Sequence, residues 1–194
     1  MIRKSLIELC VLTAALMLAA CDKSPEPVAP AAEEPAVDIV AELNQLYHEF
    51  DEEMLALNPV AATFRGDHRF NDTFGPYDFL SDEYGEAMYD LHKRYLARLL
   101  EYDSGSLSGQ DRLNYEIFQY DRQNAIEREE LGFNDYESLT PVSQFFSVAN
   151  ILPMLGSGSV GQPFATPQHY DDWIKRSSFF VRNVDLSISK MREG

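Results

Sequence analysis

The sequence predicts an all-α protein, an irregular multi-helix array with long loops. Three observations predict this fold class. From residue 38 onward, apolar residues recur every three or four positions, which places them on one face of an α-helix. No stretch shows the clear apolar–polar alternation of a strand, and Pro or Gly separates the helical patterns. A chain of 194 residues, 45% hydrophobic and 25% charged, has the composition of one globular domain.

The amino-terminal segment, residues 1–20, predicts a signal peptide. Arg3 and Lys4 supply the positive start, and an apolar run of 11 residues follows at positions 10–20. A membrane-spanning helix needs about 20 apolar residues, so this run is too short to be one. We therefore expect an export signal.

The end of this segment resembles a bacterial lipobox, because Leu18, Ala19 and Ala20 precede Cys21. The resemblance implies cleavage after Ala20 and acylation of Cys21 with palmitate-type chains. Three acyl chains exceed the two signals that a stable membrane anchor needs. The alternative is a plain secretory signal that leaves a free thiol at Cys21. We expect a lipid-anchored protein of the bacterial cell envelope that faces the periplasm, with the inner or outer membrane left open.

Residues 21–37 are expected to form the lipidated cysteine and a linker rich in Pro, Ala and Glu, which favours an extended backbone. The formal net charge of -16 repels nucleic acid and anionic headgroups. We expect no nucleic-acid partner, and a helical domain of residues 38–194 that stands off the membrane on its tether. Cys10 leaves with the signal and Cys21 carries lipid, so no cysteine pair remains for a disulfide.

The first predicted helix begins at residue 38 and ends before Asn58. Asn58 can cap the next, short helix, with Pro59 at its first position and Gly66 at its end. The apolar stripe of the first helix consists of Ile39, Leu43, Leu46, Phe50, Met54 and Leu57.

Further helices are expected where a cap residue precedes an apolar stripe. After an aromatic-rich loop at residues 67–80, Ser81 caps a helix that runs to about residue 102. Ser108 starts a helix at residues 110–131, and Thr166 with Pro167 starts the last one. Residues 133–167 are the least regular stretch. The inward positions of the two middle helices are expected to be Tyr84, Met88, Leu91, Tyr95 and Leu99, then Leu113, Ile117, Tyr120 and Ile126.

Two fragments resemble functional motifs, but the residues around them do not fit a zinc site or a dinucleotide-binding site. His48 and Glu52 share a helix face, but the zinc-peptidase pattern H-E-x-x-H has histidine at the second position. Residues 156–161 match G-x-G-x-x-G, yet no strand precedes them and Pro163 follows, so they read as a loop. We assign no catalytic and no metal-binding residue in this chain.

The best local candidate for a ligand site is the loop of Gly66, Asp67 and His68, with Asp72 nearby. Loops often carry functional side chains, although Asp67 and Asp72 also suit turns and caps. His92 and His169 are expected to be solvated or satisfied by their neighbours. The aromatic pairs at residues 145–146 and 179–180 are expected to pack in the core or at a surface.

Four stretches together resemble the bacterial domain-of-unknown-function 885 family, DUF885. They are residues 58–72, 111–118, 166–173 and 191–194. Members are similar to helical zinc carboxypeptidases, and their zinc motif lies beyond the region seen here. The resemblance therefore implies an amino-terminal portion with an incomplete fold, no cofactor in this chain, zinc in the full-length family, and a peptide substrate only for a full-length protein.

Three functions remain open at this stage. The first is the amino-terminal part of a lipid-anchored, metallopeptidase-like envelope protein that is inactive alone. The second is a complete small helical lipoprotein that acts as a binding or interaction module. The third is a degraded gene product without activity. The sequence does not indicate the substrate or the oligomeric state.

Overall fold

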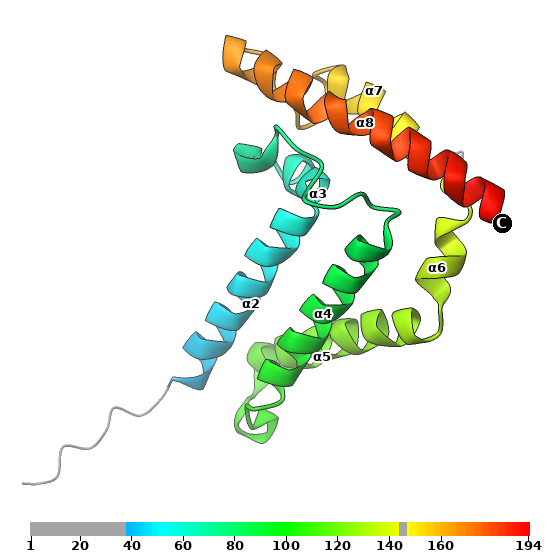
Figure 1. The fold of residues 1–194 in the computed structure, drawn as a ribbon. Helices are drawn as coiled ribbons and strands as arrows, with labels where there is room; N and C mark the ends of the chain where they lie inside the picture. Colours follow the sequence, from blue (N-terminus) through cyan, green and yellow to red (C-terminus); the bar gives the residue numbers. More distant parts are fainter. Residues whose placement is uncertain (1–37, 144–146) are drawn as a thin grey trace, which may run out of the picture. The chain divides into compact units, whose positions relative to one another are not determined.

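The caps and apolar stripes of the sequence become helices in the computed structural model, which describes residues 38–143 and 147–194. All regular structure in these two ranges is helical, so the all-α prediction is confirmed (Figure 1). The elements in chain order are α2 (Ile39–Leu57), α3 (Pro59–Phe64), η1 (His68–Phe70), α4 (Asp82–Leu99), η2 (Ser104–Ser106), α5 (Gly109–Glu130), α6 (Phe133–Ser138), α7 (Val148–Gly156) and α8 (Pro167–Glu193).

The helix starts lie where the cap residues predict them. Asn58, Ser81 and Thr166 each accept a hydrogen bond from a backbone N–H of the first helical turn. Pro59 and Pro167 occupy the first helical positions, where a missing N–H costs nothing. The helix after Ser81 ends at Leu99, because the backbone tightens into turns before Ser104.

The first hydrophobic core lies among α2, α4 and α5. Helix α4 packs against both of the other two. The contact is made by the predicted stripes of α2 and α4, which place Leu46, Leu91 and Tyr95 at no more than 1% exposure. Aromatic rings fill the seam, with Phe50 in edge contact with Tyr95 and Phe118.

A second core joins α3, α7 and α8. Its buried members are Val60, Phe74, Ile151 and Leu155, with Trp173 and Phe179 packed against them. Polar contacts tie α8 to the aromatic-rich loop and to α4: Lys175 pairs with Asp72, Asn183 donates to Asp78 at 2.8 Å, and Lys190 lies 3.2 Å from Asp82. The long helix α8 therefore joins segments that are about a hundred positions apart in the sequence.

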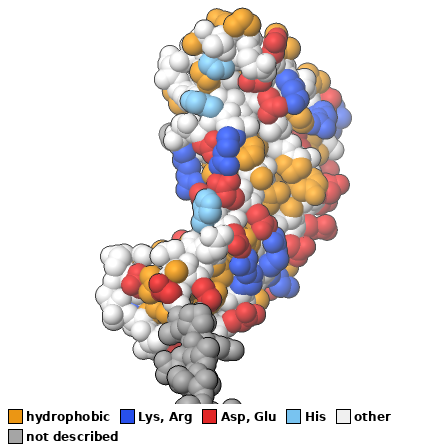
Figure 2. Space-filling view, turned by 90° about the vertical axis from the view of Figure 1, so that its left-hand side faces the viewer, with side chains coloured by type: hydrophobic (Ala, Val, Ile, Leu, Met, Phe, Trp, Pro, Cys, Tyr) orange, Lys and Arg blue, Asp and Glu red, His pale blue; other side chains and the backbone are white. Residues whose placement is uncertain are grey.

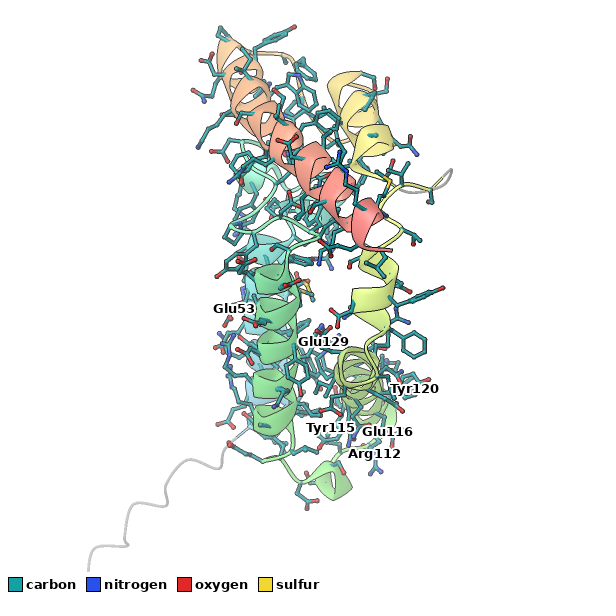
Figure 3. The ribbon with its side chains drawn as sticks, turned by 45° about the vertical axis from the view of Figure 1, so that its right-hand side comes forward. Glu53, Arg112, Tyr115, Glu116, Tyr120 and Glu129 are labelled. Atoms are coloured by element: carbon teal, nitrogen blue, oxygen red, sulfur yellow. The ribbon has the colours of Figure 1, made fainter. Side chains whose placement is uncertain are left out.

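The predicted inner face of α5 is wrong. Leu113, Ile117 and Tyr120 are 47%, 51% and 65% exposed, whereas Tyr115 is buried. Figure 3 shows Tyr115 between α4 and α5 and Tyr120 on the opposite side of α5. The helix carries apolar residues on two sides, and α2 and α4 contact the side that also holds Phe118.

No helix among the described residues is long and apolar enough to cross a membrane. The predicted signal peptide and linker lie outside the described residues, as do Phe145 and Phe146. Phe179 packs against the second core, as expected for part of an aromatic pair.

Candidate functional site

The loop of Gly66, Asp67 and His68, which is the candidate ligand site from the sequence, is stabilised by hydrogen bonds among its own and neighbouring residues. Asp67 caps η1 by accepting a hydrogen bond from the backbone N–H of Arg69 at 3.1 Å. Its carboxylate also binds the Arg69 guanidinium at 2.6 Å, and these bonds lower the pKa of Asp67 to about 2. His68 Nδ1 lies 3.0 Å from the side-chain amide of Asn71. Asp67 thus has a structural partner at each oxygen, and Gly66 supplies the left-handed turn before it.

Arg69 also binds Glu52 of the His48–Glu52 pair on α2. Glu52 accepts two hydrogen bonds from Arg69, at 2.6 and 2.9 Å, which lower its pKa. His48 on the same face is exposed. Because Arg69 occupies both oxygens of Glu52, the fragment joins α2 to the loop and does not form a histidine–carboxylate metal pair.

Other carboxylates of α2 are bound by α4. Arg98 donates to Glu49 at 2.7 Å and Arg94 to Glu53 at 2.7 Å. Tyr95 donates to Glu53 at 2.7 Å, and burial together with this bond raises the pKa of Tyr95 to about 12. Figure 2 shows acidic and basic side chains intermingled over one face of the molecule, and Figure 3 shows Glu53 on the α2 side of α4.

The glycine-rich segment at residues 156–161 ends α7 and leads toward α8 as a loop, as its context indicated. A Cβ on Gly161 would lie 2.5 Å from the carbonyl oxygen of Thr63, so glycine permits a close backbone approach here.

His169 Nδ1 accepts a hydrogen bond from the backbone N–H of Ala165 at 3.1 Å, so a neighbour satisfies it. Ala20 and Cys21 lie outside the described residues, and their lipidation stays a prediction.

Arg176 on α8 is a buried, hydrogen-bonded arginine that no local sequence pattern predicted. The side chain is fully buried and donates to the carbonyl oxygens of Thr73 and Pro59, at 2.9 and 3.3 Å, and to Gln162 Oε1 at 2.7 Å. Its guanidinium lies 5.3 Å from the Phe74 ring centre. Burial lowers the pKa of Arg176 to about 10, so it stays charged at neutral pH. This arginine locks α8 to two loops and the start of α3.

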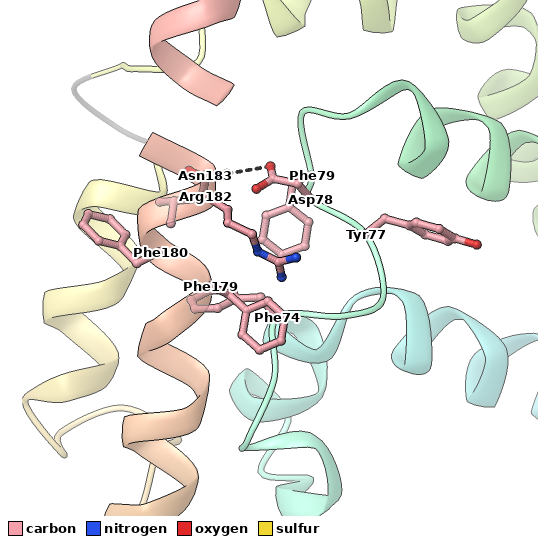
Figure 4. Close-up of a pocket in the computed structure, with 9 residues that line it drawn as sticks. Phe74, Tyr77, Asp78, Phe79, Phe179, Phe180, Arg182 and Asn183 are labelled. Atoms are coloured by element: carbon pink, nitrogen blue, oxygen red, sulfur yellow. Dashed lines mark hydrogen bonds between the residues drawn. The ribbon is translucent and has the colours of Figure 1, made fainter. Parts of the chain in front are cut away.

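Two cavities lie near this part of the fold. The smaller, about 20 Å³, is enclosed by Phe74, Phe79, Phe179 and neighbours, and has room for about one water molecule (Figure 4). The larger is a cleft of about 970 Å³ between α4 on one side and the end of α5, α6 and the following loop on the other. We call it the α4–α6 cleft. Its size lies at the upper end of the range for ligand sites, about 300–1,000 Å³.

His92 lines the α4–α6 cleft, and the expectation that it is solvated or satisfied by its neighbours is wrong for its Nδ1. Its side chain is 8% exposed, and its Nδ1 has no hydrogen-bond partner among the described residues. The ring lies 5.7 Å from that of Phe50 on α2. Burial and the charge of Arg122 lower the pKa of His92 to about 4, so the ring is neutral at pH 7. A buried polar atom without a partner is uncommon in native proteins.

Several carboxylates line the α4–α6 cleft. Arg128 pairs with Glu137 at 2.9 Å, and Glu129 points from α5 into the space between α4 and α6 (Figure 3). A Cβ on Gly85 would lie 3.6 Å from Glu129 Oε1, in ordinary contact, so the Glu129 side chain reaches from α5 to α4. The acidic lining consists of Asp82, Glu86, Glu129, Asp135 and Glu137.

A comparison with protein families found one match, which covers residues 59–194 and therefore most of the helical part. The matching model is described as bacterial protein of unknown function, DUF885. The chain belongs to the DUF885 family. Searches of curated proteins and of solved structures found no match. The family assignment confirms the resemblance seen in the sequence, and residues 59–194 of this DUF885 chain hold both Arg176 and the α4–α6 cleft.

The donor set of this DUF885 chain does not fit the zinc ion that the family resemblance implies. Within residues 38–143 and 147–194, no group of three His, Cys, Asp or Glu side chains is placed to hold a metal ion. Zinc sites take three or four such ligands at about 2 Å, so no step of a zinc mechanism is assigned to the described residues.

The cleft was missed because its residues have no common sequence signal. They come from five helices and two loops, and the sequence around each carboxylate is that of an ordinary solvent-facing residue. His92 gives one weak signal: it lies directly after Leu91, in a helix whose stripe repeats every three or four residues. A position next to a stripe residue can be drawn inward when a second helix covers it.

Proposed function

We propose that this DUF885 chain is the helical amino-terminal part of a lipid-anchored envelope protein related to zinc metallopeptidases, and that it cleaves no peptide by itself. One observation carries the proposal: α5 and α8 expose rows of large apolar side chains. Rows of this kind mark contact with other polypeptide. The exposed residues are Leu113, Ile117, Tyr120 and Leu131 on and after α5, and Tyr170, Ile174, Val181, Ile188 and Met191 on α8.

The row on α8 has the spacing of a helix that packs along another helix. Ile174, Val181 and Ile188 are seven residues apart, and they are 65%, 63% and 40% exposed. A heptad repeat of apolar residues keeps one seam of a helix turned toward its partner. In this proposal, polypeptide outside the described residues covers the seam and supplies the metal ligands.

The test uses the chain from residue 21 onward with Cys21→Ser, which keeps it unacylated. We expect it to bind a hydrophobic dye and to self-associate at rising concentration, because the two rows face water. The matched control replaces Ile117, Tyr120, Ile174 and Val181 with Gln. The control should keep the helical circular dichroism and lose most dye binding. Equal dye binding in both proteins would contradict the proposal.

The activity claim has a separate test. The same unacylated protein, supplied with zinc, is assayed against a library of short peptides. We expect no metal-dependent hydrolysis above a zinc-only blank. Turnover that a chelator abolishes would overturn the claim that the chain is inactive alone.

The anchor is tested in cells with a clickable fatty acid. The unsubstituted protein should take up label and partition into the membrane fraction, because acyl chains on Cys21 hold it there. Cys21→Ser should abolish both. Equal labelling of the two proteins sinks the lipoprotein proposal while leaving the family assignment intact.

A second function, a complete small lipoprotein that acts as a binding module, is favoured by the α4–α6 cleft. A cleft of about 970 Å³ formed within this chain can hold a ligand without further polypeptide. A monodisperse monomer with one cooperative thermal transition and little dye binding would support this function over the first.

A further inference from the structure

We propose that the acidic α4–α6 cleft binds a short peptide, and that the cationic side chains of the peptide make the contacts. The inference does not depend on the anchor or on the metallopeptidase relationship, because every residue that carries it belongs to this chain. Three observations support it: the unpaired carboxylates of the cleft, a buried unpartnered imidazole, and aromatic rings in the lining.

The first observation is the surplus of negative charge. Five carboxylates line the cleft, namely those of Asp82, Glu86, Glu129, Asp135 and Glu137, against the single arginine Arg128. Arg128 pairs with Glu137, and Lys190 of α8 lies 3.2 Å from Asp82.

Three acidic side chains of the cleft therefore lack a cation. Glu129 accepts a hydrogen bond from the neutral side-chain amide of Asn134. Glu86 and Asp135 have neither an ion pair nor a side-chain hydrogen bond within the described part of the chain. Walls of one charge sign in a partly enclosed space concentrate ligands of the opposite sign.

The second observation is His92. Its side chain is 92% buried and lines the cleft, yet Nδ1 has no partner within residues 38–143 and 147–194. The charged and titratable groups that face it are Arg122 and Asp121 of α5, and Phe50 of α2 covers the ring. A neutral imidazole carries one donor and one acceptor nitrogen, so Nδ1 can bind a polar group of a ligand. A peptide supplies such groups from its amides, which a simple ammonium ion does not.

The third observation is the aromatic lining. Phe79 and Tyr84 lie with ring centres 5.5 Å apart, and Tyr89 adds a further ring. Guanidinium and ammonium groups favour aromatic faces, guanidinium more often. The protein already uses this contact, because Lys93 lies 4.7 Å from the Tyr89 ring centre.

These features together select a peptide over other cations. The carboxylates are spread along α4, α5 and α6 and do not converge on one point, and no metal-binding group occurs among the described residues. A volume of about 970 Å³ far exceeds that of one metal ion or one small amine. Arginine side chains on a flexible backbone can reach separate carboxylates at once.

The experiment measures binding of a fluorescent hexapeptide of alternating arginine and glycine to the chain from residue 21 with Cys21→Ser. The comparison peptide carries citrulline, which keeps the shape of arginine without its charge. We expect the arginine peptide to bind and the citrulline peptide to bind at least about tenfold more weakly. Equal affinities for the two peptides would overturn the proposal.

The site is located with matched charge-neutral variants. Glu86→Gln with Asp135→Asn removes the two unpaired carboxylates and should weaken binding about tenfold. Glu83→Gln with Glu127→Gln removes two exposed carboxylates of α4 and α5 that do not line the cleft, and should change affinity less than about twofold. Equal weakening by both pairs would mean that the peptide responds only to net charge, which contradicts a site.

Two further arms test the ligand class and the role of the histidine. Spermidine should not compete at concentrations that saturate arginine-peptide binding, and competition at equal affinity would replace the peptide by a simple polyamine. His92→Phe keeps an aromatic ring next to Phe50 but removes Nδ1, so it should weaken the binding of both peptides by the same factor. Unchanged affinity in a folded His92→Phe protein would overturn the contact to His92.

Discussion

At the scale of single residues, two buried polar side chains have opposite environments. Arg176 has a partner for each of three nitrogens, and the partners belong to four different segments once its own helix is included. His92, a neutral ring at pH 7, leaves one ring nitrogen without a partner near the positive charge of Arg122. The first arrangement stabilises the fold, because a buried charge is tolerated only when its hydrogen bonds are made. The unpartnered Nδ1 of His92 lowers the stability of the fold, and buried groups that lower stability are often found at functional sites.

His92 makes stability depend on pH. Its pKa is about 4 in the folded protein and 6.5 in the unfolded chain, so only the unfolded chain binds this proton between those values. Stability is therefore full above pH 6.5 and falls as the pH drops toward 4, by roughly 2–3 kcal/mol from this group. Urea unfolding of the unsubstituted protein and of His92→Phe at pH 7 and pH 4 measures the effect.

The substituted protein should lose less stability over this interval, because phenylalanine takes up no proton. The lowered carboxyl pKa values, such as that of Asp67, destabilise both proteins equally as the pH falls. An identical loss in both proteins would show that His92 does not titrate in the folded state as described.

Arg176→Met tests how much the buried hydrogen bonds of Arg176 stabilise the fold. Methionine keeps much of the side-chain length but leaves the Thr73 carbonyl oxygen and Gln162 Oε1 without their Arg176 donor. The Pro59 carbonyl oxygen keeps only the bond from Thr63 Oγ1 among its side-chain donors. We expect a loss of about 3 kcal/mol in the free energy of unfolding. Arg192→Met, near the exposed end of the same helix, is the control and should change stability by less than about 0.5 kcal/mol. A similar small effect of both substitutions would contradict the structure.

At the scale of elements, the helix starts were predictable and the buried face of α5 was not. Cap residues act within one turn, so Asn58, Ser81 and Thr166 could be recognised from their immediate neighbours. Helix α5 carries apolar residues on two sides, and periodicity alone cannot say which side meets a partner. The guanidinium of Arg122 lies 3.9 Å from the Phe50 ring centre, so a charged residue covers part of the buried seam.

Substitutions on α5 distinguish its two faces. Ile117→Gln and Tyr120→Gln should each change the stability of this chain by less than about 0.5 kcal/mol, because both side chains already face water. Tyr115→Ala should cost about 3 kcal/mol, since Tyr115 is 4% exposed and packs in the first core. Thermal unfolding followed by circular dichroism measures both. A large loss from Ile117→Gln would mean that the outer row is buried in this chain.

At the scale of the whole molecule, the described helical part begins at Asp38, where the sequence predicts that a linker ends. Asp38 caps α2 through the backbone N–H groups of Val40 and Ala41, at 3.1 and 3.2 Å. Within the described residues, the first hydrophobic core includes Ile39 and Val40, which directly follow this cap. The linker composition of residues 22–37 offers few side chains for packing.

If residues 21–37 form a linker, as their composition predicts, a chain that begins at Asp38 should melt within about 2 °C of one that begins at residue 21, because the cap is kept. Differential scanning calorimetry compares the two, with Cys21→Ser in the longer chain. Removal of Asp38 as well should lower stability by about 1 kcal/mol through loss of the cap. A much lower melting temperature for the Asp38 chain would show that the linker is part of the domain.

The sequence by itself determined α2, α3, α4, α5 and α8, the caps at Asn58, Ser81 and Thr166, the acidic charge and the family, because each depends on neighbouring residues, on composition or on motif order. It did not predict α6 and α7, which lie in the stretch that it marked as irregular. The tertiary structure decided which face of α5 is buried, why Arg176 is needed, and that a cleft with an unpartnered histidine forms beside α4. Burial depends on which distant segments meet. The partners of Arg176 lie up to 117 positions away, a distance at which no local pattern predicts contact.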